Sequence, residues 1–93
     1  MRIKLQFTKE ALFDYKEAFD WYADIDKSLS NSFRVQVDNL LDKIIEAPNH
    51  FPIVESQTRR AILNRFPYGI FFILEQESIV ITAILHHKRE PRQ

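Results

Sequence analysis

The feature that most constrains this chain is a pair of apolar segments near its C-terminal end. Residues 70–74 (Ile-Phe-Phe-Ile-Leu) and 79–85 (Ile-Val-Ile-Thr-Ala-Ile-Leu) are rich in β-branched and aromatic residues, which favours strands that are apolar on both faces. A strand with one face in water would instead alternate apolar and polar residues. The chain must therefore cover both faces of a sheet, or leave an apolar face for a partner.

The C-terminal half predicts a meander of three antiparallel strands, at residues 60–66, 68–75 and 78–86. Pro67 separates the first two strands and Gln76-Glu77 separates the last two, so each gap allows only a hairpin connection. Residues 48–58 contain two prolines and have no helical period. We expect them to form one long connection that leads into the meander.

The N-terminal part predicts a short strand followed by a helix. Ile3, Leu5 and Phe7 alternate with polar residues, and Thr8 is suited to cap the helix that comes next. The apolar stripe of this helix has spacings of three and four and comprises Ala11, Leu12, Tyr15, Ala18, Phe19 and Tyr22. The opposite face is expected to expose the charged residues Glu10, Asp14, Lys16, Glu17, Asp20 and Asp24.

A second helix is predicted after the polar residues 26–28, with Ser28 or Ser30 as its cap and Pro48 beyond its end. Its apolar stripe comprises Phe33, Val37, Leu40, Leu41 and Ile44. Two helices joined by so few residues must lie antiparallel. The predicted fold is therefore α+β with the order β-α-α-β-β-β, in which a helical hairpin packs on one face of a mainly antiparallel sheet. With 93 residues, the chain is expected to form a single domain over 1–93.

Composition excludes several kinds of site. The chain has no Cys and one Gly, which excludes disulfides, thiolate metal sites and a glycine-rich phosphate loop. His86 and His87 are adjacent on a predicted strand and point to opposite faces, while His50 lies in a distant loop, so we expect no metal site. No serine hydrolase or zinc protease motif is present, and no cofactor is expected.

The charges balance to zero, which argues against a surface built to bind nucleic acid directly. The N-terminal residues show no signal peptide pattern, and no apolar run approaches the roughly 18 residues that span a bilayer. We therefore expect a cytoplasmic protein without a membrane segment.

Basic residues of the C-terminal half are candidates for a functional cluster. The predicted strand pairing would bring Arg60, Arg65, His86 and Arg89 near one another, and guanidinium groups bind phosphates and carboxylates. A metal-independent ribonuclease needs such cations together with a proton-transfer group, and His86 is suited to that role. The alternative is that the arginines pair with acidic groups of the helices or of a partner protein, and that His86 is a strand-end residue.

A series of short motifs in a fixed order spans almost the whole chain. They are Ala11, Tyr15, Ala18 and Trp21-Tyr22, then Phe33, Pro48 and Phe51-Pro52, then residues 60–63, 66–70 and 83–86, and finally Arg89 and Pro91. In order and spacing, the chain resembles the RelE/ParE superfamily, the toxins of bacterial type II toxin–antitoxin modules. The resemblance implies the same element order as derived above.

The resemblance also implies a cognate antitoxin, whose C-terminal segment wraps across the sheet and helices. The residues expected to contact the antitoxin or the target are Arg60, Arg65, Arg89, Phe71 and Ile73. A homodimer and a toxin–antitoxin hetero-oligomer are both compatible with it.

Activities diverge within this superfamily, because RelE-like members cut mRNA on the ribosome whereas ParE-like members inhibit DNA gyrase. The neutral charge and the absence of any Tyr after Tyr68 favour a ParE-like inhibitor that is not an enzyme. Two alternatives stay open. One is a RelE-like ribonuclease that uses His86 with Arg60, Arg65 and Arg89, and the other is an interaction module without toxicity.

Overall fold

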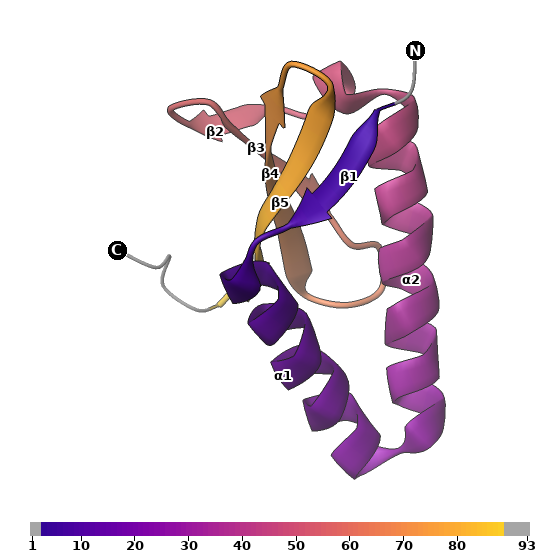
Figure 1. The fold of residues 1–93 in the computed structure, drawn as a ribbon. Coiled ribbons are helices and arrows are strands. Elements are labelled where there is room, and N and C mark those ends of the chain that lie inside the picture. Colours follow the sequence, from indigo (N-terminus) through magenta and orange to yellow (C-terminus); the bar gives the residue numbers. More distant parts are fainter. Residues whose placement is uncertain (1–2, 89–93) are drawn as a thin grey trace.

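A computed structural model describes residues 3–88 and shows a helical layer packed on a sheet (Figure 1). The elements are β1 (Lys4–Phe7), α1 (Lys9–Ile25), α2 (Lys27–Glu46), the 3₁₀ turn η1 (Pro48–His50), β2 (Ile53–Glu55), β3 (Thr58–Ile62), β4 (Tyr68–Glu75) and β5 (Ser78–His86). The strands lie in the order β1-β5-β4-β3-β2, with β1 parallel to β5 and the other pairs antiparallel. The predicted two-layer α+β fold is confirmed.

The long connection before the meander holds more structure than the sequence predicted. It contains η1 and the short strand β2, which pairs with β3 at the edge of the sheet through Ile53 and Arg59. The order is thus β-α-α-β-β-β-β. The first strand of the predicted meander, residues 60–66, also shifts. It corresponds to β3, which ends at Ile62 because residues 63–67 form the turn that leads past Pro67 into β4.

Helix α1 begins as predicted but is turned about its axis relative to the predicted stripe. The Thr8 hydroxyl oxygen accepts a hydrogen bond from the Ala11 backbone N–H at 3.0 Å. Leu12, expected in the core, is 54% exposed, whereas Asp14, expected in water, is only 7% exposed. The reason is that Asp14 faces β5, where its carboxylate accepts a hydrogen bond from the Ile84 N–H at 3.0 Å.

Helix α2 is capped by Asp26, so the expectation of Ser28 or Ser30 was wrong. The Asp26 carboxylate accepts hydrogen bonds from the Ser28 backbone N–H at 2.8 Å and from the Ser28 hydroxyl at 2.9 Å. These bonds, the backbone one first, lower the pKa of Asp26. Asp26 alone separates the two helices, and Figure 1 shows the sharp hairpin that results. Within residues 3–88, neither helix is long and apolar enough to cross a membrane.

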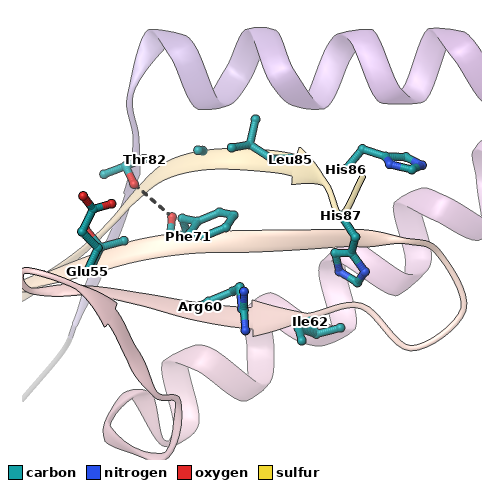
Figure 2. A pocket seen from close by; sticks show the side chains of 10 residues that line it. Glu55, Arg60, Ile62, Phe71, Thr82, Leu85, His86 and His87 are labelled. Atoms are coloured by element: carbon teal, nitrogen blue, oxygen red, sulfur yellow. Dashed lines mark hydrogen bonds between the residues drawn. The ribbon is translucent and has the colours of Figure 1, made fainter. Parts of the chain in front are cut away.

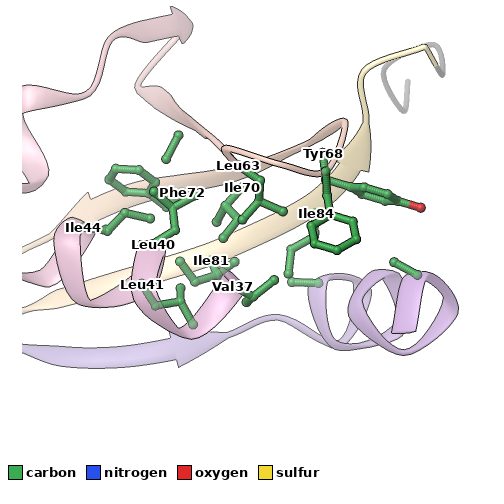
Figure 3. Close-up of a cluster of buried hydrophobic side chains, with 14 of the residues drawn as sticks. Val37, Leu40, Leu41, Ile44, Leu63, Tyr68, Ile70, Phe72, Ile81 and Ile84 are labelled. Atoms are coloured by element: carbon green, nitrogen blue, oxygen red, sulfur yellow. The ribbon is translucent and has the colours of Figure 1, made fainter. Parts of the chain in front are cut away.

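The core lies between α2 and the sheet, where Figure 3 shows the α2 stripe against inward side chains of β4 and β5. All five residues of the predicted α2 stripe are buried. Phe33 is fully buried, and its ring lies 5.4 Å from each of the rings of Tyr22, Phe66 and Tyr68. Burial, followed by the nearby Asp38 carboxylate, raises the pKa of Tyr15 at the rim of this aromatic cluster.

A β-bulge in β5 changes which of its residues face the helices. Phe71 pairs with Ala83, but Phe72 pairs with Ile81, so Thr82 is the extra residue. Ile79 and Ile81 are buried before the bulge, and Ile84 is buried after it. Since side chains alternate along a strand, Leu85 joins Phe71 on the face that carries no helix.

Candidate functional site

The helix-free face of the sheet forms a groove of about 470 Å³. Figure 2 shows side chains from β2, β3, β4 and β5 converging on it. Its lining consists of Glu55, Thr58, Arg60, Ile62, Phe71, Thr82, Ala83, Leu85, His86 and His87. The two strands that were predicted to be apolar on both faces therefore place one of those faces in an open groove.

Arg60 supplies the positive charge of a guanidinium to this groove, and Glu55 supplies a carboxylate at its β2 end. It pairs with Phe71 across β3 and β4, and its side chain lies on the helix-free face (Figure 2). The stem of Arg60 passes Gly69, where a Cβ would lie 3.4 Å from Arg60 Cγ and 3.5 Å from Cδ, at van der Waals distance. Within residues 3–88, the buried Arg60 Nε has no hydrogen-bond partner. An unpaired donor on a half-buried guanidinium favours binding of a carboxylate or another acceptor supplied by a partner.

The neighbouring Arg59 has a structural role instead. Its side chain points the other way and its Nη1 donates to the Phe51 carbonyl oxygen at 2.7 Å and to the Asn49 carbonyl oxygen at 3.4 Å. These bonds hold the turn before β2 against β3. The adjacent arginines therefore have different roles, because successive residues of a strand face opposite sides.

Apolar side chains form the walls of the groove. Phe71 and Leu85 are partly buried, and Ile62 is 52% exposed. The bulged Thr82 donates its hydroxyl to the Phe71 carbonyl oxygen at 3.3 Å (Figure 2). Ile73 lies two residues along β4 from Phe71, on the same face but outside the groove lining. An extended chain laid in this groove would contact apolar side chains, the Arg60 guanidinium and the Glu55 carboxylate.

His86 and His87 lie at the end of the groove. The His86 Nδ1 accepts a hydrogen bond from the Lys88 backbone N–H at 3.0 Å, and the ring packs against Tyr68 with centroids 5.1 Å apart. In Figure 2 the His86 ring extends away from Arg60, whereas His87 lies on the side of Ile62. The Nδ1 bond ties His86 to the turn that ends β5, which is the geometry of a strand-end residue.

The predicted basic cluster assembles only in part. Arg60 and His86 line the same groove, but Arg65 is exposed in the turn between β3 and β4 and does not line it. The reason is that the last β3–β4 pair is Ile62 with Gly69, so Arg65 lies beyond the paired strands. Arg89 lies outside the described residues. Among residues 3–88, no three His, Asp or Glu side chains gather as metal ligands would.

Sequence reasoning missed Ile62, Thr82, Leu85 and His87. Alternation from Arg60 places Ile62 on the groove face, so that signal was present in the sequence. The position of Leu85 depends on the bulge at Thr82, which the sequence pattern does not mark.

The helical hairpin and the five-stranded sheet have the arrangement that the resemblance to RelE/ParE toxins implied. The family model described as ParE toxin of type II toxin–antitoxin system, parDE, matches residues 5–91, and the chain belongs to this family. The resemblance to the RelE/ParE superfamily is thereby confirmed on its ParE side.

A solved structure supports the same fold. The chromosomal ParDE TA system from P. aeruginosa contains a chain that matches with a TM-score of 0.79. The match covers 90% of this chain and 95% of that chain, at 18% sequence identity. This likeness shows a shared fold. No curated protein sequence matches the chain.

Proposed function

We propose that this ParE-family toxin inhibits DNA gyrase, and that a cognate antitoxin neutralises it by placing an extended segment in the groove of the helix-free face. Membership of the ParE family supports the target. The observation that carries the antitoxin site is the unpaired Arg60 Nε between the apolar side chains of Phe71 and Ile62.

The chemistry of the groove specifies the segment that fits it. A carboxylate of the antitoxin pairs with the Arg60 guanidinium, in a charge-assisted bond that is stronger than a neutral one. Apolar side chains at alternate positions of the segment pack on Phe71 and Leu85. A segment of this kind is disordered when free and folds on binding, since the groove supplies the apolar surface that it lacks alone.

A ribosome-dependent ribonuclease is the second candidate, and it is favoured by the fact that His86 and Arg60 line the same groove. Because the His86 Nδ1 already accepts a backbone hydrogen bond, only Nε2 would exchange protons with RNA. The His86 ring packs against Tyr68 and extends away from Arg60, and this separation supports the gyrase proposal over the nuclease.

Two assays run in parallel test the target. Purified protein is added to gyrase supercoiling of plasmid DNA and to cell-free translation, with primer extension to map mRNA cuts. The proposal expects loss of supercoiling with intact mRNA, and no change in either assay for His86→Ala. Cuts at ribosome-positioned codons that disappear in His86→Ala would replace the proposal with the ribonuclease. Activity in neither assay, for a folded protein, would leave a non-toxic binding module.

A separate titration tests the antitoxin site, using the antitoxin encoded by the neighbouring reading frame. Loss of a charged hydrogen bond costs about 1.5–3 kcal/mol, so Arg60→Ala should weaken binding roughly 10- to 100-fold. Arg34→Ala is the matched control, because Arg34 is an exposed arginine on α2, 3.7 Å from Asp38. Equal affinities for the two variants would remove Arg60 from the site.

A further inference from the structure

Helix α1 carries a second apolar surface, on the opposite layer of the fold from the groove. Phe13, Trp21 and Ile25 are 60%, 62% and 61% exposed. Together with Glu17 they follow one another at steps of four residues, so they form a single ridge along the helix, about 18 Å long. We call these four residues the α1 ridge.

The α1 ridge faces neither the core nor α2. Tyr15 and Tyr22 make the ring contacts with Phe33 of α2, and they lie on a different side of the helix from the ridge. Leu12 is also exposed, at 54%, but on the opposite flank. The ridge thus leaves three large apolar side chains more than half exposed on one side of the helix, and exposed apolar surfaces of this kind are often functional.

Acidic residues border the α1 ridge. Glu10 and Asp24 lie on its side of the helix, and Glu17 lies within it. Two lysines lie at the Phe13 end, where Lys9 is four residues before Phe13 and Lys16 three residues after it, so the acidic residues dominate only from Glu17 to Ile25. Lys16 bonds to Asp20 at 2.6 Å, a contact that raises the pKa of Lys16. Trp21 lies with Glu17, Asp20 and Asp24 around a shallow hollow of about 340 Å³.

The negative charge beside the α1 ridge indicates which kind of partner the ridge binds. A second copy of the chain would bring the same carboxylates against one another, which opposes self-association. A lysine- or arginine-bearing partner would pair with them instead. A helical partner fits this geometry, because a row of residues four apart packs into the groove between two such rows on another helix. A strand cannot be added here, because α1 has no strand edge.

We propose that the α1 ridge is a second protein-binding surface, which takes an amphipathic helix whose apolar stripe is flanked by basic residues. The surface is distinct from the groove around Arg60 and leaves that groove accessible. Glu17 and Asp24 give the surface its preference for basic partners, and burial of Phe13, Trp21 and Ile25 gives the affinity.

Trp21 is the single tryptophan of the chain, so its fluorescence reports on the α1 ridge directly. The probe is a synthetic 14-residue helical peptide with leucines at helical spacing flanked by lysines, compared with the same peptide carrying glutamates. The lysine peptide should give a saturable blue shift of the Trp21 emission, at least tenfold tighter than the glutamate peptide. Glu17→Lys should abolish this preference, and Phe13→Ala should weaken binding about tenfold.

Leu12→Ala is the matched control, since Leu12 is the neighbouring exposed apolar residue on another face of the same helix. It should leave the affinity unchanged. Equal binding of the two peptides, or equal losses in Leu12→Ala and Phe13→Ala, would overturn the proposal in favour of unspecific apolar adsorption. A dimer that sedimentation detects in the parent chain and not in Phe13→Ala would assign the ridge to a second copy. Circular dichroism verifies that each variant is folded.

Discussion

The substitution Asp14→Ala tests how the β5 backbone is hydrogen-bonded beyond the point where β1 ends. Strand β1 pairs with β5 only as far as Phe7 with Ile81, and the chain then turns into α1. Beyond that point the Thr8 N–H donates to the Ile81 carbonyl oxygen, and Asp14 accepts from the Ile84 N–H at 3.0 Å. A carboxylate on a helix therefore takes the place of a strand neighbour.

The cost of removing this carboxylate follows from the burial of its partner. Ile84 is 2% exposed, so water does not readily replace the lost acceptor. A buried N–H that loses a charged acceptor costs about 1.5–3 kcal/mol. At about 4–8 °C per kcal/mol for a domain of this size, a loss of about 2 kcal/mol lowers the Tm by about 8–16 °C. Asp14→Asn keeps a carbonyl oxygen and should lose less.

Denaturant unfolding and amide hydrogen exchange measure the two parts of this prediction. The free energy of unfolding should fall in Asp14→Ala, and the Ile84 amide should exchange faster than the global loss of stability explains. Asp24→Ala is the control, because Asp24 is an exposed aspartate of the same helix. If the two variants differ by less than about 0.5 kcal/mol, the reasoning about the sheet edge is refuted.

Three further predictions concern the core, the sheet and the helix cap. Phe33→Ala should cost about 3–5 kcal/mol in denaturant unfolding, because Phe33 is fully buried among other rings, and Phe33→Leu should cost less. Gly69→Ala should raise the free energy of unfolding by about 0.5 kcal/mol, since the new methyl meets only the flexible methylenes of Arg60 and the ring edge of Phe71. Because the pKa of Asp26 is lowered, its cap contributes its full stability above the ordinary aspartate pKa of 3.8 and loses it as the pH falls through the folded-state pKa. The Tm of Asp26→Asn should therefore fall less than that of the parent chain between pH 5 and 3, as thermal unfolding measures.

The sequence predicted the element order because apolar periodicity and chain breaks carry that information. The α2 stripe, the Thr8 cap and the two hairpin gaps all follow from patterns within a few residues. The rotation of α1 did not follow, because the burial of Asp14 depends on Ile84, which is 70 residues away. Asp14 lies three residues after Ala11 and four before Ala18, on the buried face, but a carboxylate is expected in water unless its distant partner is known. The short strand β2 was missed for a local reason, because it has only three residues and follows two prolines, which favour a loop.

The candidate site was predictable where it depends on strand alternation. Arg60 and Phe71 were named from the sequence, and the structure places them side by side on the helix-free face. Arg65 was grouped with them on the assumption that the first strand of the meander extends to residue 66. The strand ends at Ile62, and this difference of four residues moves Arg65 out of the groove.

The bulge at Thr82 determines which residues of β5 face the core and which face the groove. With strict alternation, Ile79, Ile81, Ala83 and Leu85 would share one face, and Ile84 would lie on the other. The extra residue instead puts Ile84 into the core and Leu85 into the groove, so the helices gain a large side chain at Ile84 and the groove gains one at Leu85. Because β5 is apolar at nearly every position, Ile84 and Leu85 can exchange faces without placing a charge in the core. The two-sided apolar pattern of residues 79–85 therefore serves two surfaces at once, the buried face under α2 and the open face where we propose that the antitoxin binds.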